Sequence, residues 1–97
     1  MHITIRRYKV ESPKEAAQIT NERFIPLISK VAGLVAYYGI ETGEDSWTTV
    51  SVFETPAGAE ESNRVAAEFI KNNPDAARVI KSKPEIIAGS VSAHKAK

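Results

Sequence analysis

Four segments of the chain alternate between apolar and polar residues, and this alternation predicts four β-strands. In the first, residues 2–10, Ile3 and Ile5 lie between polar neighbours. The alternation shifts at Arg7-Tyr8, which predicts a β-bulge there. The other three strands are expected at residues 34–42, 47–53 and 85–94, with a hairpin loop at 43–46.

A helix is expected between the first two strands, because Ser12 can cap it and Pro13 suits its first turn. Glu15 would complete a capping box, and Gly33 suits the end of the segment. Pro26 falls inside and predicts a kink or a break into two pieces. The apolar stripe of this helix consists of Ala16, Ile19, Phe24, Leu27, Ile28 and Val31.

The second half of the chain repeats this plan. Thr55-Pro56 predicts the start of another helix that runs to about Asn72. Asp75 is expected to cap a short helix that ends at about Lys81. The inner side of the longer helix is expected to carry Ala59, Ser62, Ala66, Phe69 and Ile70.

The order strand–helix–strand–strand–helix–strand predicts an α+β, ferredoxin-like βαββαβ fold with a four-stranded antiparallel sheet. Right-handed crossovers place the first and third strands in the middle. The fourth strand then pairs with the first, and the second with the third. A length of 97 residues suits one domain, 1–97.

Two helices can cover only one face of such a sheet. We expect the apolar residues under the helices: Ile3, Ile5, Leu34, Ala36, Tyr38, Ile40, Val50, Val52 and Val91. The opposite face mixes polar and aromatic residues, which is typical of a ligand pocket and equally of a dimer interface. The candidate pocket residues on it are Thr4, Arg6, Tyr37, Trp47, Thr49, Ser51 and Phe53, with His2, Val35, Ser90, Ser92 and His94 of the same parity.

Composition excludes several kinds of site. The formal charge of +1 lacks the basic excess expected of a nucleic-acid-binding surface. With no cysteine, disulfides, thiolate metal sites and cysteine nucleophiles are excluded. No apolar run suits a signal peptide or a membrane span, so neither a membrane nor a nucleic acid is an expected partner, and the cytoplasm is the expected location.

Three polar groups have a plain interpretation beside a functional one. Arg6 could hold an anion, although a strand arginine more often pairs with water or a carboxylate. His2 and His94 could approach each other across the first and fourth strands, but two imidazoles alone predict no metal site. Asn63 invites a catalytic role on the second helix, yet the margin of the apolar stripe is its simpler place.

Two segments of the chain resemble the dimeric α+β barrel superfamily. One is the entry to the second strand, Gly33-Leu34-Val35-Ala36-Tyr37-Tyr38. The other is the passage from the third strand into the second long helix, Val50-Ser51-Val52-Phe53-Glu54-Thr55-Pro56-Ala57-Gly58-Ala59. Within it, the chain is most similar to antibiotic-biosynthesis-monooxygenase-like domains. The resemblance implies a homodimer whose two sheets form a barrel, with a small cavity in each subunit between sheet and helices. Some members oxygenate polycyclic phenols without metal or flavin, some degrade haem, and many have no known activity.

Haem degradation is disfavoured by this chain's own residues. The Asn that haem-degrading members carry on the first strand falls on or near Arg6. Their Trp and His lie on helical segments in the second half, whereas the only Trp here, Trp47, is on the third strand. No catalytic residue is assigned, and no metal or other cofactor is expected.

The function that the resemblance favours is a cofactor-independent monooxygenase acting on a small aromatic or polyketide-like molecule. Pre-aimed donors would stabilise its anion, and the candidates are Arg6, Tyr37, Trp47 and Thr49. Two alternatives stay open. One is a non-catalytic small-molecule-binding module, and the other is a structural dimeric module whose second sheet face is filled by its partner.

Overall fold

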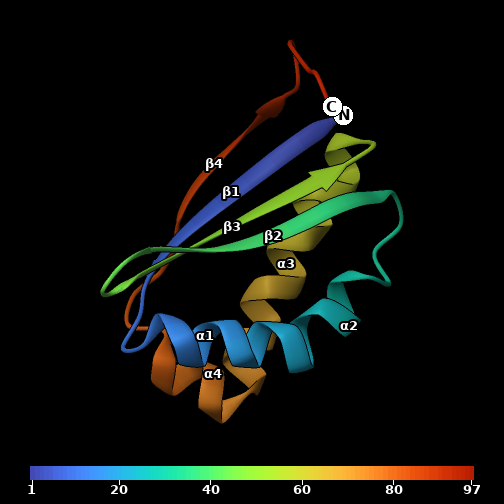
Figure 1. Ribbon diagram of the computed structural model, residues 1–97. Coiled ribbons are helices and arrows are strands. Elements are labelled where there is room, and N and C mark those ends of the chain that lie inside the picture. The colour runs from blue at the N-terminus through green and yellow to red at the C-terminus, as the bar shows by residue number, and fades with distance from the viewer.

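The computed structural model describes residues 1–97 and places the helices in one layer against one side of a twisted sheet (Figure 1). The strands are β1 (His2–Lys9), β2 (Leu34–Gly43), β3 (Ser46–Phe53) and β4 (Glu85–Ser90). The helical segments are α1 (Pro13–Ile19), the π-helical η1 (Thr20–Phe24), α2 (Ile25–Ile28), α3 (Pro56–Asn72) and α4 (Pro74–Val79).

The sheet has the order β2-β3-β1-β4, and β1 pairs antiparallel with both neighbours. The predicted α+β, ferredoxin-like fold and strand order are therefore confirmed. The predicted bulge at Arg7-Tyr8 is wrong, because β1 stays in register with β3 along its whole length. The register shifts lie in β2 instead, the first of them between Leu34 and Ala36.

Two of the predicted helix caps are present. Ser12 Oγ accepts a hydrogen bond from the Glu15 N–H at 3.2 Å, and Thr55 Oγ1 accepts one from the Gly58 N–H at 3.2 Å. The third cap differs, because Asn73 rather than Asp75 caps α4. Pro74 occupies the first turn of α4, so the capping position falls one residue before the proline.

The first helix is interrupted just before Pro26, as the sequence predicts. Pro26 has no N–H and its ring crowds the preceding turn. The chain widens into the π-helical η1, where the Ile25 N–H donates to the Thr20 carbonyl, five residues earlier. The two α-helical pieces on either side therefore meet at a wide turn.

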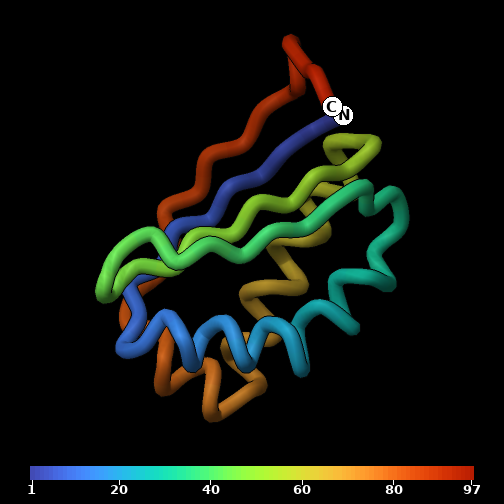
Figure 2. The backbone as a smooth tube through the Cα atoms, in the orientation of Figure 1, coloured from blue at the N-terminus to red at the C-terminus, as the bar shows by residue number.

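The face assignment is wrong, and this is the main correction to the sequence interpretation. The helices lie on one side of the sheet (Figure 2). The burial of its residues shows that the polar and aromatic face is the one they cover. Thr4, Arg6, Thr49, Ser51 and Phe53 are each at most 3% exposed. Alternation assigns residues to two faces, but it does not say which face the helices cover; polar groups on α3 pair with the polar sheet residues.

The apolar face has no helix over it. On this outer face, Ile87 is 69% exposed and Tyr38 is 58% exposed. The remaining apolar members are partly or fully accessible as well: Ile3, Ile5, Ala36, Ile40, Val50 and Val52. Leu34, expected among them, pairs with Phe53 on the covered face, because the register shift after it changes the parity of β2.

Three smaller expectations also need correction. The last strand ends at Ser90, so Val91 and His94 lie beyond the sheet. Leu27 is 40% exposed and does not belong to the buried stripe, since the wide turn rotates the residues after it. Glu15 does not close a capping box but pairs with Arg78 of α4. No helix is long and apolar enough to cross a membrane.

Candidate functional site

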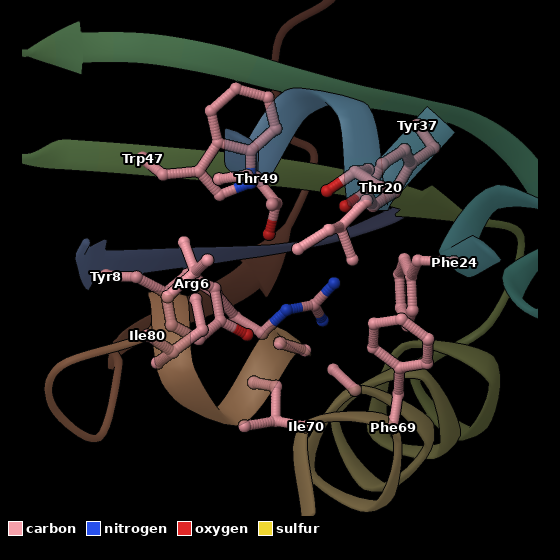
Figure 3. Close-up of a pocket in the computed structure, with 15 residues that line it drawn as sticks. Arg6, Tyr8, Thr20, Phe24, Tyr37, Trp47, Thr49, Phe69, Ile70 and Ile80 are labelled. Carbon is pink, nitrogen blue, oxygen red and sulfur yellow. The ribbon is translucent and has the colours of Figure 1, made fainter. Parts of the chain in front are cut away.

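A small cavity of about 40 Å³ lies between the covered face of the sheet and the helices (Figure 3). It sits where two core clusters meet, and Phe69 of α3 packs against both. Twelve of the fifteen lining residues are hydrophobic; the exceptions are Arg6, Thr20 and Thr49. The cavity therefore has apolar walls and a few polar groups, which is the composition of a small-molecule site.

Arg6 is the charged group of this cavity and is only 1% exposed. Its Nη1 donates to Asn63 Oδ1 at 2.9 Å and to Ser62 Oγ at 3.3 Å. Its Nη2 donates to Ser51 Oγ at 3.1 Å. Figure 3 shows the side chain extending from β1 toward the middle of the lining residues. These bonds connect β1 to β3 and α3, so they fix the guanidinium in place.

The partners of Arg6 are themselves held by further hydrogen bonds. Ser62 Oγ donates to the Ala59 carbonyl at 2.6 Å, which leaves its lone pairs for the guanidinium. Thr4 Oγ1 donates to Asn63 Oδ1 at 3.1 Å, so this amide oxygen accepts from two side chains of β1. The buried polar network is therefore ordered around one cation.

No carboxylate neutralises this cation. The ion pairs of the chain involve Arg23, Arg64 and Arg78, all on the surface. No Asp or Glu lines the cavity. Arg6 Nε and Thr49 Oγ1 are buried and have no hydrogen-bond partner in the chain. A buried charge with only neutral partners is costly, and such a feature often marks a functional site.

Two tyrosines beside Arg6 stay neutral over an extended pH range. Burial raises the pKa of Tyr37 to about 12, although the positive charge of Arg6 opposes this shift. Burial also raises the pKa of Tyr8, again against the effect of Arg6. Both hydroxyls therefore remain protonated near neutral pH and can act as hydrogen-bond donors.

Trp47 forms one wall of the cavity, and Gly39 makes its position possible. A Cβ at Gly39 would lie 2.4 Å from Trp47 Cζ2, so only glycine lets the indole pass beneath β2. On the opposite side, Phe24 of η1 makes tilted contacts with Tyr37 and Phe69, with ring centroids 5.6 and 5.3 Å apart. Aromatic rings therefore surround the cavity on several sides.

The structure separates the candidate pocket residues into three groups. Arg6, Tyr37, Trp47 and Thr49 line the cavity. Thr4 and Ser51 lie behind it and bond to the network around Arg6. Phe53 does not line the cavity; it is fully buried in the core cluster that contains Phe24 and Ile28, where it packs against α3. Their roles in function stay a prediction.

The sequence places Ser62 on the inner side of the helix and Asn63 at the margin of its apolar stripe, but it does not connect them to Arg6, whose guanidinium they bind. Thr20 and Tyr8, which line the cavity, were not among the candidates. The role of Ser62 could have been found, because a serine on the inner stripe of a helix needs a buried partner. Asn63 follows it directly, but no local pattern connects it to β1.

Neither histidine lines the cavity. His2 Nδ1 is 3.5 Å from Ser90 Oγ, and His94 lies beyond the end of β4. No group of three or more His, Cys, Asp or Glu side chains is placed to hold a metal ion.

No protein-family model and no curated protein sequence matches the chain. Solved structures do. A protein of unknown function from Nitrosomonas europaea has a TM-score of 0.73 at 21% identity, and the match covers 99% of this chain and 93% of that one. SnoaB, a cofactor-independent oxygenase from Streptomyces nogalater, has a TM-score of 0.71 at 13% identity, with 96% and 94% covered.

A monooxygenase from the gene ActVA-Orf6 of Streptomyces coelicolor, solved in complex with nanaomycin D, has a TM-score of 0.73 at 9% identity, with 99% and 91% covered. The fold is that of antibiotic-biosynthesis-monooxygenase-like proteins. This confirms the fold expected from the resemblance. At these identities the similarity concerns the fold alone, so the activity has to be argued from the cavity.

Proposed function

We propose that this chain is a cofactor-independent, monooxygenase-like protein of one domain, residues 1–97. Its substrate is a small aromatic or polyketide-like molecule, bound in the cavity between sheet and helices. The observation that carries the proposal is Arg6, a buried cation without a carboxylate partner at the edge of an aromatic cavity. In such a protein, oxygen reacts with an electron-rich substrate anion, and fixed donors stabilise that anion.

The cavity walls support an aromatic ligand. Trp47, Phe24 and Phe69 offer ring faces and edges, while Thr49 and Tyr37 offer hydroxyls on one side. A volume of about 40 Å³ holds only about three water molecules. It favours a ligand of one ring, and a larger molecule requires α1 and η1 to move away from the sheet.

Oxygen uptake tests the catalytic proposal. The purified protein is mixed with anthrone, hydroquinones and naphthols, without added metal or flavin, and oxygen consumption is compared with the uncatalysed rate. Anthrone, with three rings, requires α1 and η1 to move away from the sheet, and in its reaction one O₂ yields anthraquinone and one water. We expect uptake above background that falls at least tenfold in Arg6→Gln and is retained in Arg7→Gln, the neighbouring surface arginine. Uptake equal to background with the whole panel would contradict catalysis.

The alternative is a binding module that uses the same cavity without turnover. The features that favour it are the small cavity and the absence of a lining Asp, Glu or His that could act as a base. Ligand-induced stabilisation in a thermal-shift assay, with no oxygen uptake, would support this second reading.

The homodimer expected from the resemblance is also part of the proposal. Its support is the outer face of the sheet, where large apolar side chains such as Ile87 and Tyr38 are exposed. An apolar surface of this kind is typical of an interface. A second copy of the chain placed on it would close the sheets into a barrel.

Light scattering tests the dimer. We expect a mass of two chains at micromolar concentration, and a single chain for Ile87→Lys, which places a charge on the outer face. Glu68→Lys, on the exposed side of α3, is the matched control and should stay dimeric. A wild-type protein that is monomeric at these concentrations would refute the dimer.

A further inference from the structure

We propose that the cavity selects aromatic molecules that are already ionised, as carboxylates or acidic phenolates, and binds their oxyanion at Arg6 and Thr49. This inference rests on the aromatic cavity of the proposed function, but it does not depend on oxygenation. It names the charge of the ligand and the atoms that receive it.

The positive charge of Arg6 is not balanced by any residue around it. The guanidinium of Arg6 is protonated at any ordinary pH and is 1% exposed. Its hydrogen-bond partners, Asn63, Ser62 and Ser51, are all neutral. Neutral dipoles compensate only part of the lost hydration of a buried ion. An anion in the cavity would complete the compensation, whereas a neutral ligand would not.

Two polar atoms of the cavity-lining residues have no hydrogen-bond partner. Arg6 Nε and Thr49 Oγ1 both belong to residues that line the cavity, both are buried, and neither has a partner in the chain. The other guanidinium nitrogens are already bonded to the protein. Both atoms are enclosed by their neighbours, so an oxyanion has to displace lining side chains to reach them. The charge-assisted bonds that it would then receive are the strong kind.

The cavity contains no side chain that could act as a base. No Asp, Glu, His or Lys lines the cavity. Tyr37 and Tyr8 hold their protons because burial raises the pKa of each. The cavity therefore has no group that could take a proton from a bound phenol. The proton of a bound phenol has to go to water, so the cavity favours acids that are ionised near neutral pH.

A spectroscopic titration with 4-nitrophenol tests this inference. Its phenolate absorbs at a longer wavelength than the phenol, so the protonation state of the bound molecule is measured directly. We expect its pKa to fall by at least one unit when it binds to the wild-type protein. We also expect 4-nitrophenolate to bind at least tenfold more tightly than 4-nitrotoluene, a neutral molecule of nearly the same shape.

Matched variants assign the effect to the proposed atoms. Arg6→Gln should remove the preference for the phenolate, whereas Arg7→Gln, one residue away on the exposed face, should retain it. Thr49→Val should weaken phenolate binding without weakening 4-nitrotoluene. The Thr49 variant and the wild-type titration decide the matter even if Arg6→Gln does not fold.

The outcomes separate this inference from the proposed function. If 4-nitrotoluene binds as tightly as the phenolate, or the pKa of bound 4-nitrophenol does not fall, the selection of oxyanions is refuted while an aromatic cavity remains. If neither molecule binds at millimolar concentration, the ligand-binding cavity itself is refuted, and the inference fails with it.

Discussion

The buried face of the sheet is largely polar, and the exposed face is largely apolar, which is the reverse of the usual arrangement. The face under the helices carries Thr4, Arg6 and Ser51, which are at most 1% exposed. The outer face carries isoleucines and valines, yet Ile87 on it is 69% exposed. Polar residues are thus enclosed and apolar residues are open. The pattern of a strand separates its two faces, but the partner of each face decides which is buried.

The difference follows from what each face has to contact. The covered face meets Ser62 and Asn63 of α3, so its polar groups find hydrogen bonds inside the protein. The outer face has an apolar centre with polar residues such as Arg7 and Glu85 toward one end, and no element of the chain packs on it. Most polar groups of the covered face are therefore paired within the monomer, and the apolar centre of the other face is suited to a partner. The variants below test this contrast.

The largest expected effect is on the covered face at Phe53, which is fully buried. Phe53→Ala should lower the free energy of unfolding by about 3 to 5 kcal/mol, because it opens a cavity that rigid neighbours cannot fill. Urea denaturation measures the change. Phe53→Leu, which keeps most of the volume, should cost clearly less; equal losses would mean that the site collapses freely.

The next effect depends on pH. Folding raises the pKa of Tyr37 from 10.0 to about 12. Between these values the unfolded chain loses the phenolic proton while the folded chain keeps it, so stability falls as the pH rises through this window. The total decrease should approach about 2 to 3 kcal/mol.

Urea denaturation at about pH 9 and about pH 11.5 measures this decrease in the wild type and in two variants. Tyr37→Phe should reduce it, whereas Tyr38→Phe, on the outer face, should retain it. The same pH dependence in both variants would disprove the role of Tyr37.

A third effect concerns how closely the strands approach the aromatic wall. Gly39→Ala would place a methyl group 2.4 Å from Trp47 Cζ2, so the indole or β2 has to move. We expect a loss of about 1 to 3 kcal/mol in thermal or urea unfolding. Gly89→Ala is the matched control, since nothing lies within 4 Å of its added Cβ. A loss that is no larger at Gly39 would contradict the close packing.

The smallest effect is expected on the outer face. Tyr38→Ala should change the free energy of unfolding by about 0.5 kcal/mol or less at low protein concentration, because the ring is mostly exposed. At high concentration it should weaken the proposed dimer, so the dependence of Tm on concentration decreases. A large loss at low concentration would mean that the outer face is part of the monomer's own core.

Much of the fold can be predicted from local sequence signals. Ser12-Pro13 and Thr55-Pro56 specify helix starts through capping bonds between residues three positions apart, and Pro26 specifies an interruption for equally local reasons. Strand order follows from the order of elements and the handedness of crossovers. These features depend on neighbours in the chain, so the sequence alone contains them.

The site is harder to predict because its bonds are long-range. Arg6 was a candidate, but its partners Ser62 and Asn63 lie more than fifty positions away on α3. Val35 shows a second limit. A single register shift beside it changes the parity of β2, and alternation cannot locate such a shift. Leu34 and Val35 were therefore assigned to the wrong faces, whereas the covered face as a whole was misassigned because alternation does not say which face the helices cover.

The π-helical turn from Thr20 to Phe24 has a consequence for insertions and deletions in evolution. A wide turn of this kind holds one residue more than an ordinary α-helix of the same span. Because the turn absorbs the extra residue, deleting one residue there would restore a regular α-helix of the same span, and the flanking pieces would keep nearly the same orientation. Thr20 and Phe24, which both line the cavity, would then lie three positions apart and still share one helix face. In related chains, this turn should therefore be a place where the length changes by one residue while the cavity keeps its shape.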